Sequence, residues 1–286
     1  MRKNLLLIGI LGVYFASCSK FLENDVEAVS KKNAQEIQDY INSKNLQTIS
    51  TAEGIHYFYK KNSLGRNIEV GDEVTIHYSR SLLNGTPIDS SSRLTNTPVK
   101  YIHGYAYIPC ITEASKILKE GERGVFLVPS AYAYGSQSNA IVPANSVVRL
   151  DMEILKLRSE DQQIEDYINY LKTVNLSLTE KTSSGLRFVR ETSSNGTQLK
   201  AGLLATVKYE GYLASNTTKF DSGQIDVALG DGSVVKGFEE GLLKMKVGEK
   251  AILVFPSSLG YGVNGSSPKI LPYSPLIFKV EVVSAK

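Results

Sequence analysis

The sequence predicts two α+β domains in tandem, each a twisted antiparallel β-sheet folded over one short α-helix and preceded by an added N-terminal helix. The first observation is an internal repeat, because GERGVFLVPSAYAYG at 121–135 returns as GEKAILVFPSSLGYG at 248–262. The second is the strand-like alternation of apolar and polar residues at 148–154 and again at 276–282. An offset of about 130 positions is the size of a domain, because solenoid repeats span only about 20 to 50 residues.

The repeat extends beyond these segments into both halves of the chain. Two further pairs match at a similar offset: VTIHY at 74–78 with ATVKY at 205–209, and EIQDYIN at 36–42 with QIEDYIN at 163–169. A chain of 286 residues, less an N-terminal leader, divides into two units near the usual domain size of about 100 to 150 residues. We therefore place the first domain at 30–158 and the second at 159–286, with the boundary near Arg158.

The N-terminus has the pattern of an export signal, which we place at 1–17. Basic residues at positions 2 and 3 precede an apolar run over 5–15, and this run is too short to span a bilayer. Two small residues then precede Cys18. A plain signal peptide that is cut near this point is one interpretation.

The alternative, which we favour, is a lipoprotein, because Phe-Ala-Ser-Cys ending at Cys18 resembles a bacterial lipoprotein processing site. The resemblance implies that Cys18 becomes the first mature residue and carries several acyl chains, which anchor a protein stably. Residues 18–29 would then form a polar tether. We expect the protein to be extracytoplasmic and lipid-anchored to a bacterial membrane, in the periplasm or at the cell surface.

Cysteine usage agrees with such a protein. Once Cys18 is lipidated only Cys110 remains, so the chain cannot form an intramolecular disulfide. Cys110 lies among apolar residues at helical spacing, and we interpret it as a packed thiol rather than a nucleophile. Three histidines have no spacing that predicts a metal site or a catalytic partner: His56, His77 and His103.

Charge and motifs exclude other classes of function. The formal net charge is +3 and includes the basic residues at positions 2 and 3, so no nucleic-acid-binding surface is predicted. The segment 260–265 fits G-x-G-x-x-G, but Pro268 and Pro272 follow it and prevent the helix that a pyrophosphate site needs. We interpret this segment as a loop and expect neither a cofactor nor a metal.

Two helices are expected in each domain. Amphipathic stretches cover 31–46 and 159–174, and Ser159 is a capping candidate for the second of them. Shorter inner helices are expected at 108–118 and 234–245. We expect the apolar stripe of each N-terminal helix to pack on its own domain; a dimerisation helix is the alternative.

Beyond these patterns, the second half resembles FKBP-type peptidyl-prolyl cis/trans isomerases. The motifs occur in family order over 201–286: VKYEGYL, KFDSG, ALGDGSVVKGFEEGLLKMKVGEKAILVFP, LGYG, ILP and LIFKVEVV. A looser version covers 70–157, with VTIHYSRSL, PIDSS, KEGERGVFLVPSAYAYG, IVPANS and RLDMEILKL. The resemblance implies a tandem pair of FKBP-like domains.

The resemblance also implies an activity and its partners. The substrates would be proline-containing polypeptides, and a macrolide inhibitor could bind in the same cleft. Rotation about an X-Pro amide has a barrier of about 18 to 20 kcal/mol, and an apolar pocket favours the twisted amide, which is less charge-separated than the planar one. This chemistry needs no nucleophile and no cofactor.

Site residues carry over to the second domain position by position. Three are implied in catalysis: Phe238 as the floor beneath the prolyl ring, Tyr261 as a hydroxyl donor to a substrate carbonyl, and Asp221 as the group that sets polarity beside the amide. The others would form the substrate-binding walls, with the Val235 N–H binding a second carbonyl: Tyr209, Phe220, Val234, Val235, Ile270 and Phe278. Two positions depart from the family pattern, namely Ile225, usually aromatic, and Lys269, usually aliphatic.

The first domain keeps only part of this pattern. Its weaker candidate site contains Tyr78, Asp89, Ile108, Ile111, Tyr134 and Ile141. Three aliphatic residues, Ile88, Ile111 and Leu150, replace the aromatic walls and remove the flat surface on which proline stacks. We interpret the first domain as degenerate, with binding or spacing as its role; a second active site is the alternative.

Two functions follow for the whole chain. The favoured one is a peptidyl-prolyl isomerase that assists the folding of extracytoplasmic proteins, mainly through its second domain. The other is a noncatalytic FKBP-fold chaperone or assembly module. The aromatic walls beside Tyr261 and Asp221 favour the enzyme, because a scaffold has no physical need of them.

Overall fold

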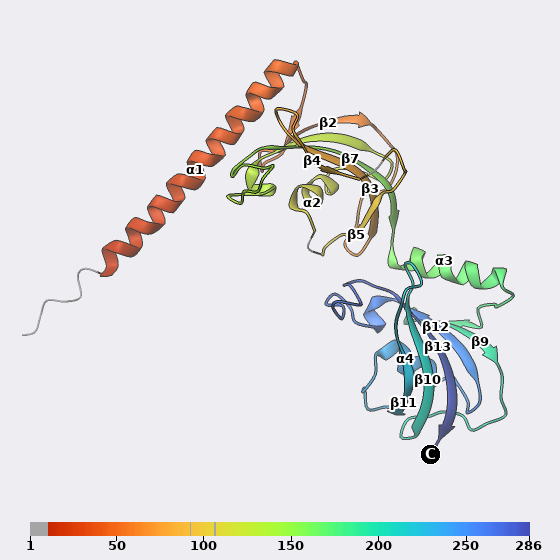
Figure 1. Ribbon diagram of the computed structural model, residues 1–286. Helices are drawn as coiled ribbons and strands as arrows, with labels where there is room; N and C mark the ends of the chain where they lie inside the picture. Colours follow the sequence, from red (N-terminus) through yellow and green to blue (C-terminus); the bar gives the residue numbers. More distant parts are fainter. Residues whose placement is uncertain (1–10, 92, 106) are drawn as a thin grey trace, which may run out of the picture. The chain divides into compact units, whose positions relative to one another are not determined.

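The computed structural model of the protein describes residues 11–91, 93–105 and 107–286, and side chains from residue 25 onward (Figure 1). Positions 1–10 of the expected signal peptide and the side chain of Cys18 lie outside the described part. The chain folds into two compact units. The larger part of the second unit begins at Leu157, and short segments at Glu69–Val74 and Lys100–Tyr105 are grouped with it.

The N-terminal helix is longer than the sequence pattern indicates. Helix α1 spans Leu11–Lys44, so the segment 18–29, expected to be a tether, is helical. The chain has no Gly or Pro between Cys18 and Lys44, and a Glu27–Lys31 ion pair one turn apart supports the helix. Within the described residues, no helix has the length and apolarity that crossing a membrane requires.

The first unit is built on a seven-stranded sheet in the order β1-β2-β6-β7-β3-β4, with β5 paired to β3. Its elements after α1 are β1 (Ile49–Ser50), β2 (His56–Lys61), β3 (Glu73–Leu82), β4 (Pro87–Ser90), β5 (Val99–Ile102), α2 (Pro109–Ser115), β6 (Arg123–Val128), the 3₁₀ turn η1 (Ser130–Tyr132) and β7 (Val148–Arg158). The short helix α2 lies within the curve of this sheet (Figure 1).

The second unit repeats the arrangement with a six-stranded sheet in the order β11-β10-β13-β12-β9-β8. Its elements are α3 (Glu160–Thr173), β8 (Glu180–Lys181), β9 (Arg187–Thr192), β10 (Leu204–Leu213), β11 (Lys219–Ala228), α4 (Lys236–Leu242), β12 (Lys250–Phe255), the 3₁₀ turn η2 (Ser257–Leu259) and β13 (Leu276–Ala285). Its strand pairs are antiparallel. The predicted fold class is confirmed.

Helices cover both faces of the second sheet. Residues at alternate positions of β12 point to opposite faces: Leu253 packs in the core with α4, and Val254 packs in the core with α3. The stripe of α3 is buried in its own unit, as expected, and Ser159 caps the helix by accepting the Gln162 N–H. Val254 of β12 and Ile277 of β13 are fully buried on the α3 face, so this helix covers two strands of the sheet from the side opposite α4.

One polar side chain ties each N-terminal helix to the 3₁₀ turn of its unit. In the first unit Asn33 is buried, and its Oδ1 accepts the Ser130 N–H at 2.8 Å. In the second unit Glu160 accepts both the Ser257 N–H at 2.6 Å and the Ser257 Oγ–H at 2.8 Å. Because each turn directly precedes Tyr134 or Tyr261, the helices help to position a wall of each cleft.

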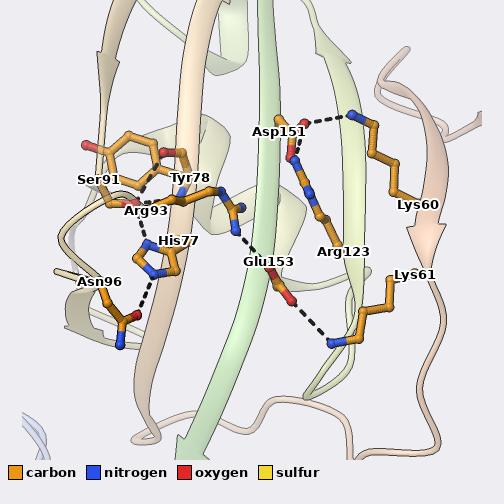
Figure 2. Close-up of polar contacts among 10 residues, drawn as sticks. All are labelled: Lys60, Lys61, His77, Tyr78, Ser91, Arg93, Asn96, Arg123, Asp151 and Glu153. Carbon is orange, nitrogen blue, oxygen red and sulfur yellow. Dashed lines mark hydrogen bonds and ion pairs between the residues drawn. The ribbon is translucent and has the colours of Figure 1, made fainter.

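The outer face of the first sheet carries ion pairs across three strands (Figure 2). Asp151 on β7 is buried and accepts from Arg123 at 2.8 Å and from Lys60 at 3.0 Å. Burial opposes its ionisation, but the bonds to Arg123 and Lys60 outweigh burial, so the pKa of Asp151 is lowered. Glu153, two residues further along β7, pairs with Lys61 and Arg93. This end of the outer face is therefore polar, whereas Leu127 of β6 packs on the same face against Ile37 and Ile41 of α1.

Candidate active site

An aromatic cavity of about 400 Å³ lies between the second sheet, α4 and the loop after η2. Its lining comprises Tyr209, Phe220, Asp221, Ile225, Gly232, Ser233, Val234, Val235, Phe238, Tyr261 and Phe278. These residues come from β10, β11, the segment before α4, α4 itself, the loop after η2, and β13. Segments far apart in the chain thus converge on one hollow.

Four aromatic rings form the floor and walls of the cavity. Phe278 stands at the centre, with its ring centre 5.0 Å from Phe238 and 5.6 Å from Phe220, both edge-to-face. Tyr209 lies 6.0 Å from Phe238 and 6.1 Å from Phe278. Phe255 stacks beneath Phe278 at 5.8 Å and holds it from the core side. Phe238 and Phe278 are only 3% and 6% exposed, so the floor of the cavity is apolar and shielded from water.

Two glycines make room for these rings. A Cβ atom at Gly211 on β10 would lie 2.6 Å from the Phe220 ring and 3.1 Å from the Phe278 ring. A Cβ atom at Gly237 would lie 2.4 Å from the Phe255 ring, so a glycine lets α4 approach β12 closely. The aromatic floor therefore depends on two positions without side chains.

A hydrogen-bonded pair forms the polar edge of the cavity. The Tyr209 hydroxyl donates to Asp221 Oδ2 at 2.8 Å, and the Ser222 N–H donates to Asp221 Oδ1 at 2.9 Å. Burial, and next the bond to Asp221, raise the pKa of Tyr209 to about 12. The carboxylate is thus fixed in orientation at the mouth of an apolar hollow.

The remaining polar groups lie at the rim. Tyr261 lines the cavity and is 38% exposed. Val235 is the N-cap of α4, and its carbonyl accepts the N–H groups of Phe238 and Glu239. The Val235 N–H precedes the first turn, where a helix offers no acceptor of its own.

The structure brings together every predicted residue of this site except Ile270. Ile270 is 3% exposed, belongs to the hydrophobic core of the second unit and is absent from the cavity lining. Ile225 lines the cavity where the family pattern has an aromatic ring. The Lys269 Nζ donates to the Phe220 carbonyl at 3.0 Å, which places an ammonium group beside Asp221.

In the first unit, three of the candidate residues, Tyr78, Asp89 and Tyr134, contact the side chain of Arg80, which the sequence pattern did not single out. The guanidinium of Arg80 pairs with Asp89 and lies over the rings of Tyr78 and Tyr134. Ile108 starts α2 as its N-cap, and Ile111 is fully buried on that helix. Ile141 is 47% exposed. The repeat itself carries the missed signal, because VTIHYSRSL aligns Arg80 with Gly211 of VKYEGYL.

A Ser–His–Asn arrangement in the first unit resembles a catalytic triad but has the wrong bonds (Figure 2). His77 contacts Ser91 Oγ through Nδ1 at 2.9 Å and Asn96 Oδ1 through Nε2 at 3.3 Å. Ser91 Oγ also accepts the Tyr78 N–H and contacts the Tyr78 carbonyl. This hydroxyl is buried and closes a strand junction, so it is not a nucleophile. In the described part of the chain, no cluster of His, Cys, Asp or Glu could hold a metal ion.

Comparison with known proteins identifies the class to which this fold and cavity belong. The profile described as FKBP-type peptidyl-prolyl cis-trans isomerase matches residues 65–155 and 195–283, which is more than half of the chain. The chain therefore belongs to the family of FKBP-type peptidyl-prolyl cis-trans isomerases, and it contains two domains of this family.

Individual relatives match different parts of the chain. The peptidyl-prolyl cis-trans isomerase FKBP9 of Mus musculus is 28% identical over 218 residues, covering 76% of this chain and 35% of the relative. The FK506-binding protein of Neisseria meningitidis serogroup B is 42% identical over 93 residues, covering 31% of this chain and 84% of the relative. The crystal structure of the three FKBP domains of wheat FKBP73 aligns over 84% of this chain and 99% of that chain, with 22% identity and a TM-score of 0.41. The chain thus spans about a third of the length of FKBP9.

Proposed function

We propose that this protein catalyses the cis/trans isomerisation of X-Pro bonds in polypeptides, at the cavity of its second unit. The observation that carries the proposal is the convergence of four aromatic rings with the Tyr209–Asp221 pair and Tyr261 around about 400 Å³. A prolyl ring is small and apolar, and it stacks on aromatic surfaces. The predicted macrolide site is the same cavity, and the relative named FK506-binding protein supports this assignment.

The chemistry requires only that the cavity bind the twisted amide better than the planar one. Planar X-Pro amides are stabilised by charge separation between nitrogen and oxygen, and water supports that separation. The buried floor at Phe238 and Phe278 removes water from the amide. Each reduction of the barrier by about 1.36 kcal/mol speeds rotation about tenfold.

Three groups orient the substrate in this mechanism. The prolyl ring rests on Phe238, the Val235 N–H holds the carbonyl that follows the proline, and the Tyr261 hydroxyl donates to another substrate carbonyl. Asp221, held by Tyr209, keeps a fixed negative charge beside the rotating bond. Neither a covalent intermediate nor a cofactor takes part.

A protease-coupled assay on a Pro-containing tetrapeptide tests the proposal. Phe238→Ala removes the floor and Asp221→Ala removes the fixed charge; each should lower kcat/KM by about tenfold or more. Tyr170→Ala is the matched control, because it removes an exposed aromatic ring from α3, away from the cavity. A wild-type rate equal to that of buffer, together with peptide binding, would instead support the noncatalytic chaperone or assembly module.

We propose further that the protein is a bacterial lipoprotein that assists the folding of extracytoplasmic chains. The support is the N-terminal sequence pattern that ends at Cys18. Cys18→Ala should move the protein from the membrane fraction to the soluble fraction without changing its isomerase rate. Mass spectrometry of the wild-type N-terminus should show an acylated cysteine, and an unmodified cysteine would overturn this assignment.

A further inference from the structure

The cleft of the first unit is filled by one of its own side chains. Arg80 on β3 is only 7% exposed. Its Nε donates to Asp89 Oδ1 at 2.7 Å, and its Nη2 donates to Asp89 Oδ2, so the ion pair is bidentate. Its Cζ lies 5.4 Å from the ring centre of Tyr134 and 6.0 Å from that of Tyr78.

The internal repeat relates the surroundings of Arg80 to the cavity of the second unit. Three contacts of Arg80 in the first unit are Tyr78, Asp89 and Tyr134, and their equivalents in the second unit are Tyr209, Asp221 and Tyr261. All three equivalents line the aromatic cavity of the second unit. The guanidinium of Arg80 therefore lies where the second unit has an open hollow.

The walls of the first unit leave room for this side chain. Arg80 is equivalent to Gly211, where even a Cβ atom would lie 2.6 Å from the Phe220 ring. The first unit has Ile88 in place of Phe220 and Leu150 in place of Phe278, and neither is an aromatic ring. The aliphatic walls of the first unit are thus compatible with an arginine at the position where the second unit has a glycine.

The ion pair makes the occupant hard to displace. Burial disfavours the charge, but the hydrogen bonds to Asp89 outweigh it, and the pKa of Arg80 is raised above its ordinary value. A neutral prolyl ring that entered the cleft would separate the guanidinium from Asp89 and leave a desolvated charge without its partner. It would also have to replace the contacts of Arg80 with two tyrosine rings.

We propose that the side chain of Arg80 closes the cleft of the first unit. This unit then does not accept X-Pro segments, and the second unit carries the reaction alone. The assignment of the reaction to the second unit rests on the proposed function. Closure of the first cleft by Arg80 concerns the geometry of that cleft alone, and a measurement without turnover can test it.

The rate at which the Cys110 thiol is chemically modified measures whether the cleft is closed. It is fully buried, and its Sγ lies 4.0 Å from Arg80 Nη1, so the guanidinium covers the thiol. The chain has two cysteines, and Cys18→Ser leaves Cys110 as the remaining thiol. In full-length protein with this change, Arg80→Ala should increase the rate of Cys110 modification by Ellman's reagent at least tenfold. Burial raises the pKa of Cys110 and Arg80 opposes that rise, so loss of the cation does not itself activate the thiol, and faster modification reports access.

The matched control is Arg123→Ala in the same Cys18→Ser background. Arg123 also pairs with an aspartate of the first unit, Asp151, but on the outer face of the sheet (Figure 2). This variant should leave the modification rate of Cys110 unchanged. Equal acceleration by both variants would show general loosening of the unit, and no acceleration in Arg80→Ala would show that the cleft is not closed by Arg80. Either result overturns the proposal.

Titration with a peptide tests whether the second unit alone binds X-Pro segments. The tetrapeptide Ala-Leu-Pro-Phe is titrated into wild-type protein while amide resonances are followed by NMR. Shifts should occur around Tyr209 and Phe238 but not around Tyr78 and Ile111, and shifts at the latter pair would overturn the proposal. Absence of all shifts would refute the proposed function of the second unit, whereas the thiol result would still decide the state of the first cleft.

Discussion

The hydroxyl of Tyr209 on β10 donates a hydrogen bond to Asp221 Oδ2 on β11 across the mouth of the aromatic cavity, with 2.8 Å between the two oxygens. The two residues come from neighbouring antiparallel strands, in which Tyr209 is paired with Gly223. The bond fixes the only carboxylate in the cavity lining of the second unit.

Loss of the Tyr209 hydroxyl should weaken catalysis while the cavity keeps its shape. Tyr209→Phe removes the donor that orients Asp221, and a hydrogen bond to a charged group is worth about 1.5 to 3 kcal/mol. We expect kcat/KM to fall about tenfold in the coupled peptide assay. Tyr212→Phe is the matched control, because the Tyr212 hydroxyl donates to Glu210 outside the cavity, at 2.6 Å. Equal losses in the two variants would contradict a special role for the Tyr209–Asp221 bond.

The raised pKa of Tyr209 predicts a dependence of stability on alkaline pH. The folded-state pKa of about 12 exceeds the ordinary value of 10.0, so folding favours the protonated hydroxyl. This contribution is fully present below about pH 10 and is lost as the pH rises through 12. Burial likewise raises the pKa of Tyr167 to about 12, and the pKa values of five further tyrosines are raised, so wild type should lose unfolding free energy over this window at several tyrosines.

Urea unfolding at several pH values between 9 and 12 measures this loss. Tyr209→Phe should show a shallower decline than wild type over the same window, because one of the tyrosines with a raised pKa is removed. An unchanged slope in this variant would mean that Tyr209 titrates normally in the folded state.

Gly211 should be intolerant of side chains. In Gly211→Ala the new methyl group would lie 2.6 Å from the Phe220 ring, so the ring must move into the cavity. We expect a loss of about 1 to 3 kcal/mol in unfolding free energy and at least a tenfold fall in kcat/KM. Gly223→Ala on the paired strand is the control, because its methyl group would meet Tyr209 at an ordinary 3.7 Å. Similar activity in the two alanine variants would contradict the packing account of the cleft.

Lys269 should influence which residue is preferred beside the proline. Its ammonium group bonds to the Phe220 carbonyl at 3.0 Å next to the cavity, where the family pattern has an aliphatic residue. Exposed charge pairs are worth about 0.2 to 1 kcal/mol, so a peptide with Glu before Pro should be isomerised about twofold to fivefold faster than one with Lys. Lys269→Leu should abolish this preference, and about 0.5 M NaCl should weaken it in wild type. A preference that survives Lys269→Leu would assign it to another group.

Much of the fold was predictable because local pattern and burial agree. Alternation at 148–154 places apolar residues on one face of β7, and the spacing of Ile164 and Ile168 places them against the second sheet. The walls of the second cavity were identified by motif order, and all but Ile270 line it. Ile270 instead packs in the core. Motif order does not decide whether an apolar side chain lines the cavity or the core beneath it, because that depends on side-chain packing.

Two features were not predicted, and each has a physical reason. Polar composition at 18–29 suggested a tether, but polar residues with good helix propensity and ion pairs one turn apart form part of α1. Arg80 follows Ile76 and Tyr78 on the inward face of β3, yet a charged residue is usually interpreted as exposed. The pairing with Asp89 and the contacts with two tyrosine rings make burial of Arg80 favourable, and these contacts are tertiary.

Exchange NMR on a Pro-containing tetrapeptide at equilibrium tests the central claim most directly. Uncatalysed X-Pro bonds exchange over about tens to hundreds of seconds, so cis and trans resonances stay separate in buffer. A catalytic amount of the wild-type protein should produce exchange cross-peaks between them, and Phe238→Ala should abolish these peaks. Exchange in the presence of wild-type protein no faster than in buffer would contradict the account.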